Sequence, residues 1–113
     1  MGVVTLSCGL AIAQWITTFE APGAGTGAGQ GTLAEGFSPA GKTFGYYVDA
    51  SVVAHGFIRS ARGNFTTFDV PGAGTAAGQG TFPLTDNPSG TIAGFLVDGS
   101  GVAHGFVRSD RER

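Results

Sequence analysis

The chain has 113 residues and a mass of 11.3 kDa, so it forms at most one small domain whose core leaves little margin over conformational entropy. Only 12% of the residues are charged and the formal net charge is -2, which excludes the basic surface that nucleic acid or an anionic membrane attracts. With 21 glycines, nine phenylalanines and frequent valine and threonine, the composition predicts an ordered all-β protein rather than a disordered chain.

Residues 1–15 form an apolar N-terminal segment that is too short to span a bilayer. It contains Ala11-Ile12-Ala13, the A-x-A pattern of a signal-peptidase site, but lacks the positive residues that begin a signal peptide. Two interpretations follow, a truncated signal peptide and an additional N-terminal strand. Cys8 is the only cysteine, so no intramolecular disulfide forms, and Thr5 stands where a lipoprotein signal needs leucine.

The rest of the chain consists of two tandem copies of one repeat unit. Shifting the sequence by 49 positions aligns residues 16–64 with residues 65–113 without a gap, and about 27 of the 49 positions are identical. Both units contain the phrase VAHGF followed by an aliphatic residue, arginine and serine. A repeat of this length is typical of solenoids and β-propellers.

Glycine and proline divide each unit into four short strands. In the second unit we expect them at residues 66–70, 77–84, 91–97 and 102–108. Residues 98–101 predict a tight hairpin turn in which the Asp-Gly pair supplies the positive φ, and residues 49–52 are their counterparts. No segment has helical periodicity. The predicted fold is therefore all-β, with tandem four-stranded antiparallel units of the size of a β-propeller blade.

The fourth strand of each unit predicts a sheet that is covered on both sides. It begins at Val53 in the first unit and at Val102 in the second, and its two faces are both largely apolar. Two blades do not close a ring, so the end blades leave apolar surface uncovered. We therefore expect an incomplete ring that associates with itself or with further repeat units.

A resemblance follows from the phrases FTTFDVPGAGT, GQGTF and NPSGTIAGFLVDGSGVAHGFVRS of the second unit. In this order they resemble the bacterial extracellular repeats of the HAF family, and the resemblance covers residues 16–113. It implies a propeller-like fold, a secreted or cell-surface location and a role that is structural or interactive. The chain departs from the family in copy number, since two units are fewer than members commonly carry.

Asp49 with His55, and Asp98 with His104, are the most informative pairs. In each, a turn aspartate precedes a strand histidine by six residues, so the carboxylate can accept a hydrogen bond from the imidazole and tie the turn to the strand. A catalytic group is needed once per site, whereas a structural bond is needed once per unit. The repetition therefore favours a structural role. The alternative is a metal site that uses His55 and His104 together.

Other catalytic patterns are weak. The loops GAGTGA at 23–28 and GAGTAA at 72–77 resemble a dinucleotide fingerprint, but no helix follows them, so we interpret them as wide turns or bulges. Glu35, Asp69 and Asp86 are carboxylates that a glycosidase pair would need, yet nothing singles them out. No G-x-S-x-G elbow surrounds any of the serines near the histidines, Ser51, Ser60, Ser100 and Ser109.

Aromatic residues offer an alternative role in glycan binding. Trp15, Tyr46 and Tyr47 provide rings on which sugars stack, although strand alternation buries at least one of the two tyrosines. Four arginines recur near strand ends, where we expect a solvated rim or pairing with the repeated aspartates: Arg59, Arg62, Arg108 and Arg111.

The sequence thus predicts a non-enzymatic, secreted or cell-surface repeat protein with a structural or interaction role and no catalytic residue, cofactor or metal. The expected partners are further repeat units, or a glycan or another cell-surface component, and not nucleic acid. The alternative is a carbohydrate-binding lectin of the propeller type. The predicted organisation is an N-terminal segment at residues 1–15 and two repeat units at 16–64 and 65–113.

Overall fold

The computed structural model describes residues 3–8 and 13–109 of the chain. Every regular element in this part is a β-strand, which confirms the all-β prediction. The strands are β1 (Val3–Cys8), β2 (Ala13–Thr18), β3 (Gly31–Phe37), β4 (Thr43–Val48), β5 (Ala54–Arg59), β6 (Phe65–Phe68), β7 (Gly80–Asp86), β8 (Ile92–Val97) and β9 (Ala103–Arg108).

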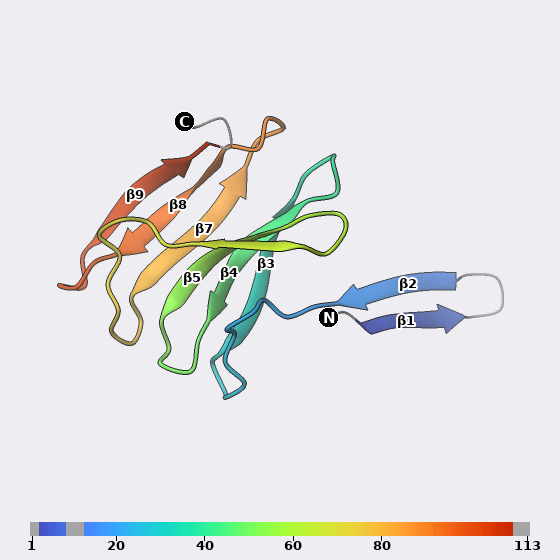
Figure 1. Cartoon of the computed structure of the whole chain (residues 1–113), viewed down its shortest axis with the longest axis horizontal. Coiled ribbons are helices and arrows are strands. Elements are labelled where there is room, and N and C mark those ends of the chain that lie inside the picture. Colours follow the sequence, from blue (N-terminus) through green and yellow to red (C-terminus); the bar gives the residue numbers. More distant parts are fainter. Residues whose placement is uncertain (1–2, 9–12, 110–113) are drawn as a thin grey trace.

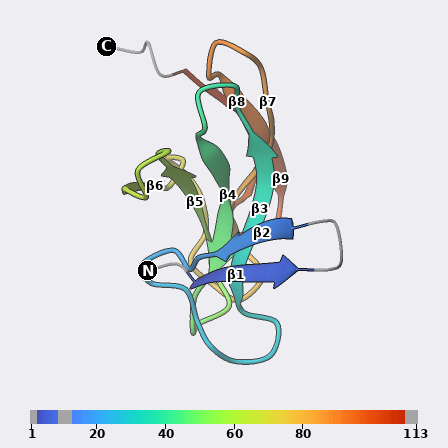
Figure 2. The same cartoon turned by 90° about the vertical axis from the view of Figure 1, so that its right-hand side faces the viewer.

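Two antiparallel meanders make the main sheet, which runs in the order β3-β4-β5-β7-β8-β9 and is not closed into a barrel (Figure 1). The meanders meet where β5 and β7 run parallel through one pair, Ala54 and Gly80. β6 pairs antiparallel with β5 and lies to one side of the curved sheet (Figure 2). Within this sheet β3, β4, β5 and β6 therefore make a run of four antiparallel neighbours, which straddles the boundary between the sequence repeats.

This offset corrects the expected composition of a unit. The first strand of the second repeat does not join the three strands that follow it in sequence; it joins the last strand of the first repeat. The reason is the short turn at residues 60–64, where the Ser60 N–H donates to the Asn64 carbonyl at 2.8 Å and the Gly63 N–H to the Ser60 carbonyl at 2.9 Å. This tight turn folds β6 back on β5.

The N-terminal strands form a separate sheet. β1 pairs antiparallel with β2 from Val3 opposite Thr18 to Cys8 opposite Ala13. Of the two interpretations of the N-terminal segment, the structure thus contains the strand, and cleavage of the segment as a signal stays a prediction. In Figure 1 this hairpin lies beyond β3, at the end of the sheet away from β9.

The second strand of the second unit begins at Gly80, three residues later than expected. The preceding loop ends in a turn in which Gly78 has a φ of +85° and the side-chain oxygen of Gln79 accepts a hydrogen bond from the Ala76 N–H at 3.0 Å. The glycine loops are therefore turns closed by glutamine, as Gln30 also closes the first by accepting from the Gly27 N–H at 2.8 Å. This matches their interpretation as wide turns.

The hairpin turns differ in one detail from the expectation. The positive φ lies not at the Asp-Gly pair but at the fourth turn residue, Gly101 with a φ of 82° and its counterpart Val52 with 64°. Asp98 instead uses its side chain, whose Oδ1 accepts hydrogen bonds from Ser100 and Val102 N–H groups at 2.8 and 2.9 Å. The aspartate is thus required as an acceptor within the turn.

The core is small and centred on Phe57 of β5, which is fully buried. Its ring packs edge-on against Phe19, with ring centroids 5.9 Å apart, and in a tilted arrangement against Phe65, with centroids 5.7 Å apart. Phe65 belongs to the second unit, so the centre of the core is shared between units. Aromatic contacts of this kind add stability beyond the area that they bury.

Strands β5 and β9 have almost the same sequence but different surroundings. Ala54 and Gly56 of β5 are buried, whereas their counterparts Ala103 and Gly105 of β9 are exposed. A Cβ added to Gly56 would lie 2.5 Å from the ring of Phe68, while one added to Gly105 meets no atom closer than 3.9 Å. What covers β5 is the second unit, and the described residues include no equivalent cover for β9.

We predict that Gly56→Ala destabilises the protein by about 1–3 kcal/mol, the usual cost of overpacking, because the Phe68 ring must leave β5. Thermal or urea unfolding measures the loss. Gly105→Ala is the matched control, since it makes the same change in the same local sequence without a clash. Equal effects of the two substitutions would contradict the arrangement of the units.

Candidate functional site

The repeated aspartate and histidine meet at the β4–β5 turn. Asp49 Oδ1 accepts hydrogen bonds from the Ser51 and Val53 N–H groups at 2.8 and 3.0 Å, and its Oδ2 lies 2.7 Å from His55 Nε2. In the second unit the distance from Asp98 Oδ2 to His104 Nε2 is also 2.7 Å. The hydrogen bond expected from the spacing is present in both units, and it ties each turn to the strand that follows.

A third residue distinguishes the two copies. Asp69, which follows β6, places its Oδ1 2.7 Å from His55 Nδ1. His55 therefore lies between a carboxylate of its own unit and one of the next unit. The side chain of His55 is 22% exposed, whereas that of His104, whose carboxylate partner among the described residues is Asp98, is 52% exposed.

Sequence reasoning named Asp69 as a carboxylate but missed this role. A signal for it exists, because the first unit has an acidic residue, Glu20, at the equivalent position. We refer to Asp49, His55 and Asp69 as the Asp–His–Asp bridge.

The charges of the bridge stabilise one another. Burial of the imidazole opposes its protonation, but hydrogen bonds from His55 to Asp49 and Asp69 outweigh it and raise the pKa of His55 above its usual 6.5. The same bond to His55, with the backbone N–H groups of the turn, lowers the pKa of Asp49 below 3.8. In the second unit, His104 and the turn N–H groups lower the pKa of Asp98 to about 2.

Tyr47 closes the bridge on one side. Its ring stacks on the His55 imidazole with centroids 4.9 Å apart, and burial followed by the charges of Asp69 and Asp49 raises the pKa of its hydroxyl. An aromatic face against an imidazolium is a favourable contact. The bridge is therefore supported by packing as well as by charge.

This geometry leaves His55 little scope for catalysis or metal binding. Both ring nitrogens already face carboxylate oxygens, so neither is available as a base or a ligand. His104 lies on β9, separated from β5 in the sheet by β7 and β8, so the structure does not bring the two histidines together. Residues 3–8 and 13–109 contain no group of three or more histidines, cysteines and carboxylates placed to hold a metal ion.

The three candidate stacking residues are dispersed. The Tyr46 ring packs against Phe82 with centroids 5.1 Å apart, and burial followed by the charge of Glu35 raises its pKa. Tyr47 points to the opposite face of β4, where it contacts His55. Trp15 lies on β2 and is 71% exposed. No shared aromatic platform results from these three.

Two of the recurring arginines have a role that the sequence did not suggest. The Arg59 guanidinium lies 4.7 Å from the centre of the Phe19 ring, and Arg108 lies 4.8 Å from that of Phe68. These cation–π contacts link the last strand of each unit to the beginning of the same unit, where Phe19 directly follows β2 and Phe68 ends β6.

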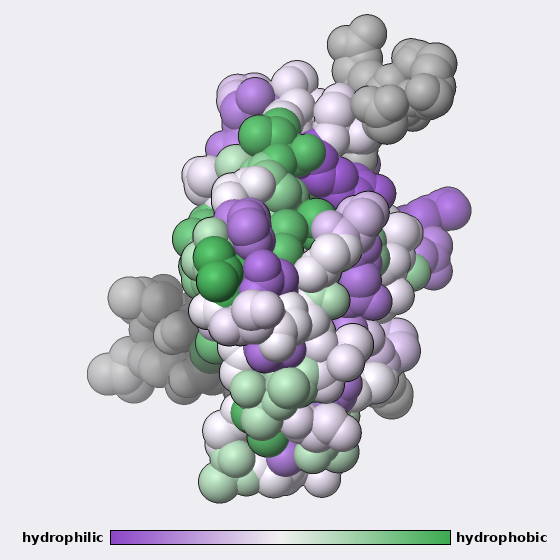
Figure 3. Space-filling model, turned by 90° about the vertical axis from the view of Figure 1, so that its left-hand side faces the viewer, coloured by the Kyte–Doolittle hydropathy of each residue, from purple (hydrophilic) through white to green (hydrophobic). Residues whose placement is uncertain are grey.

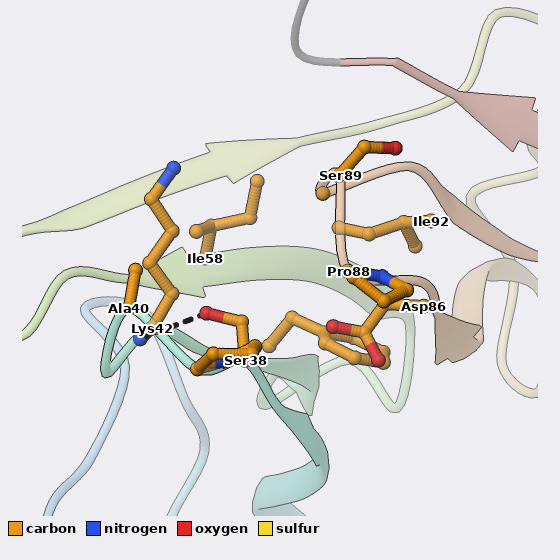
Figure 4. Close-up of a pocket in the computed structure, with 11 residues that line it drawn as sticks. Ser38, Ala40, Lys42, Ile58, Asp86, Pro88, Ser89 and Ile92 are labelled. Atoms are coloured by element: carbon orange, nitrogen blue, oxygen red, sulfur yellow. Dashed lines mark hydrogen bonds between the residues drawn. The ribbon is translucent and has the colours of Figure 1, made fainter.

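A cavity of about 280 Å³ lies between the turns that end β3 and β7 (Figure 4). Phe44, Ile58 and Ile92 form its apolar wall, while Lys42 and Asp86 stand at its polar edge. The Ser38 hydroxyl accepts a hydrogen bond from the Lys42 N–H at 3.3 Å. The cavity is lined by residues of both units, and its lining contains neither a histidine nor a cysteine.

The three candidate glycosidase carboxylates do not assemble there. Asp86 lines the cavity, Glu35 is exposed on β3, and Asp69 belongs to the Asp–His–Asp bridge. These three residues accordingly do not form the carboxylate pair that a glycosidase uses.

Comparisons with known proteins found no matching family model, no matching curated protein and no matching solved structure. In the described part of the chain no helix could cross a membrane.

We predict that His55→Ala lowers the free energy of unfolding by about 2 kcal/mol, because it removes two charge-assisted hydrogen bonds and a half-buried ring. His104→Ala should cost less, since it removes one such bond at a more exposed site. Urea unfolding of both variants measures the difference. A larger loss in His104→Ala would contradict the role of the bridge.

Stability should depend on pH in a defined way. The raised pKa of His55 gives stability that is complete below pH 6.5 and is lost as the pH rises through the folded value. The lowered pKa values of Asp49 and Asp98 give stability that is present above pH 3.8 and is lost as the pH falls, toward about 2 for Asp98. The melting temperature should therefore be highest between these limits, and His55→Ala should flatten its decline on the alkaline side.

Proposed function

We propose that this chain is a non-enzymatic, secreted or cell-surface repeat protein with a structural role, in which consecutive units fasten to one another and the end units present surfaces for interaction. The observation that carries the proposal is the Asp–His–Asp bridge. It uses the most reactive side chains of the repeat to join two units.

The surroundings of the bridge support this role. Groups that catalyse reactions need open space beside a base or nucleophile, whereas His55 is enclosed by Asp49, Asp69 and Tyr47. The resemblance of the repeat to HAF sequences supports a location outside the cell. The bridge itself brings two of the chain's eight acidic residues, Asp49 and Asp69, to the joint between the units.

A lectin is the second candidate function. It rests on the exposed indole of Trp15, since sugars stack on such rings. The half-buried Tyr46 and Tyr47, which contact Phe82 and His55, add little accessible ring surface to it.

Light scattering over a concentration series tests the structural role. We expect the mass to rise above the 11.3 kDa of one chain as the concentration increases. A mass that stays at that of one chain up to the highest concentration would count against the proposal.

A glycan array with the wild type and Trp15→Ala separates the two candidates. We expect no glycan to be bound. Binding that disappears in Trp15→Ala would favour the lectin instead.

A further inference from the structure

The joint between the two units contains two backbone hydrogen bonds. The Ala54 N–H donates to the Gln79 carbonyl at 2.9 Å, and the Gly78 N–H donates to the Val52 carbonyl at 2.8 Å. They hold the start of β5 against the loop that leads into β7. Because they involve backbone atoms, any unit with the same backbone can make them.

Side chains add two contacts to this joint. The Phe68 ring covers Gly56, where a side chain would clash with it, and the Asp69 carboxylate contacts His55. All of these contacts join the start of β5 to the segments around residues 68–69 and 78–80 of the next unit.

The first unit carries a second copy of the receiving segments, and there they are open. A groove of about 400 Å³ is lined by Phe19 and Glu20 and by residues 30–32, the counterparts of Phe68, Asp69 and residues 79–81. A Cβ added to Gly31 would meet nothing within 4 Å, whereas its counterpart Gly80 faces the backbone of Ala54. The groove is therefore lined by the same kinds of residues as the internal joint, but, among the described residues, no strand equivalent to the start of β5 lies in it.

The second unit repeats the start of β5, the segment that fills the internal joint, at the start of β9. There this segment is uncovered. Ala103, His104 and Gly105 of β9 repeat the residues Ala54, His55 and Gly56 but are exposed. Figure 3 shows the β9 end of the molecule, where hydrophobic residues are accessible among hydrophilic ones. At this end Val102 and Val107 are 51% and 71% exposed.

A second groove at β9 supports the same match. It measures about 440 Å³ and is lined by residues 68–71 and 106–109. The equivalent space in the first unit, beside Phe19 and Phe57, is filled by Phe65, whose ring centroid lies 5.8 and 5.7 Å from theirs. The residue of a second copy that corresponds to Phe65 is Ile16, which is 44% exposed.

We propose that copies of this chain join head to tail, with the start of β9 of one copy seated in the groove along Phe19, Glu20 and residues 30–32 of the next, and with that Glu20 accepting a hydrogen bond from His104. The partner is thus a second copy of the same chain. This inference rests on the proposed structural function and names its partner and its joint.

The N-terminal hairpin sets a condition on this joint. β1 pairs with Ile16, Thr17 and Thr18, the counterparts of β6 residues that pair with β5. Backbone pairing of β9 with β2 of the next copy competes with β1, so the contacts that define the joint are the Ile16 side chain and the segments that follow β2. A contact of this kind is heterologous, and it produces a ring where the rotation closes and a filament where it does not.

Two variants block the opposite ends of the joint. Gly105→Val adds a side chain at an open position of β9, where no atom lies closer than 3.9 Å to a Cβ, so the chain itself should fold normally. Glu20→Arg with Leu33→Asp changes two exposed residues, one that lines the groove and one whose counterpart, Phe82, contacts Tyr46 across the internal joint. Gly99→Ala, which copies the Ala50 of the first unit, is the control outside the joint.

Sedimentation velocity and light scattering measure the outcome, and thermal unfolding checks that each variant is folded. We expect each blocked variant alone to associate at least about tenfold more weakly than the wild type, as loss of a central contact does. An equimolar mixture of the two should form a complex of two chains and nothing larger, because one intact end remains on each. Gly99→Ala should behave as the wild type.

A wild type that associates while Gly105→Val associates equally well would overturn the head-to-tail joint and leave the proposed structural function in place. A mixture of folded variants that forms no two-chain complex would also overturn the joint. A wild type that stays a single chain at every concentration would overturn both.

Discussion

An imidazole held between two carboxylates connects the halves of this molecule. Asp49 uses one carboxylate oxygen to accept the N–H groups of the turn and the other to contact His55, so a single side chain couples the local turn to the bridge. Asp69 then adds a charge from the next unit, and the positive form of His55 is favoured by both neighbours. In a chain with only 12% charged residues, this concentration of charge at one joint gives the contact between the units its specificity.

Small residues make that joint possible. Gly56 lets the Phe68 ring lie directly on β5, and Gly80 lets the backbone of the next unit approach Ala54. Phe68 also contacts Phe106 of its own unit, with centroids 6.4 Å apart, so one ring bridges the last strands of both units. The high glycine content therefore serves close approach between units as well as turns. A fold of this kind keeps little core inside any single unit and relies on its neighbours for cover.

Much of this architecture is readable from the sequence because the repeat supplies two aligned copies of each feature. Composition and turn residues predicted the all-β class, and the six-residue spacing predicted the contact between Asp49 and His55. The pairing of β6 with β5 was not predictable from strand order alone, since it depends on the turn at residues 60–64. The role of Asp69 was missed for the same reason, because a contact between units requires knowing which strands are neighbours. The arginines were missed because their partners, Phe19 and Phe68, lie about 40 residues away in sequence.

The positions at which the two units differ bear on how strongly chains join compared with units inside one chain. Ile16 stands where the second unit has Phe65, and Leu33 stands where it has Phe82, which stacks on Phe95 and contacts Tyr46. The proposed joint between chains therefore has aliphatic side chains in place of aromatic rings at two positions and lacks their directional contacts. Competition from β1 for β2 weakens it further. The two units of one chain also benefit from covalent linkage, which raises their effective concentration. The internal joint is consequently expected to be stronger than the proposed joint between chains, so each chain would keep its own fold while the proposed contacts form and dissociate.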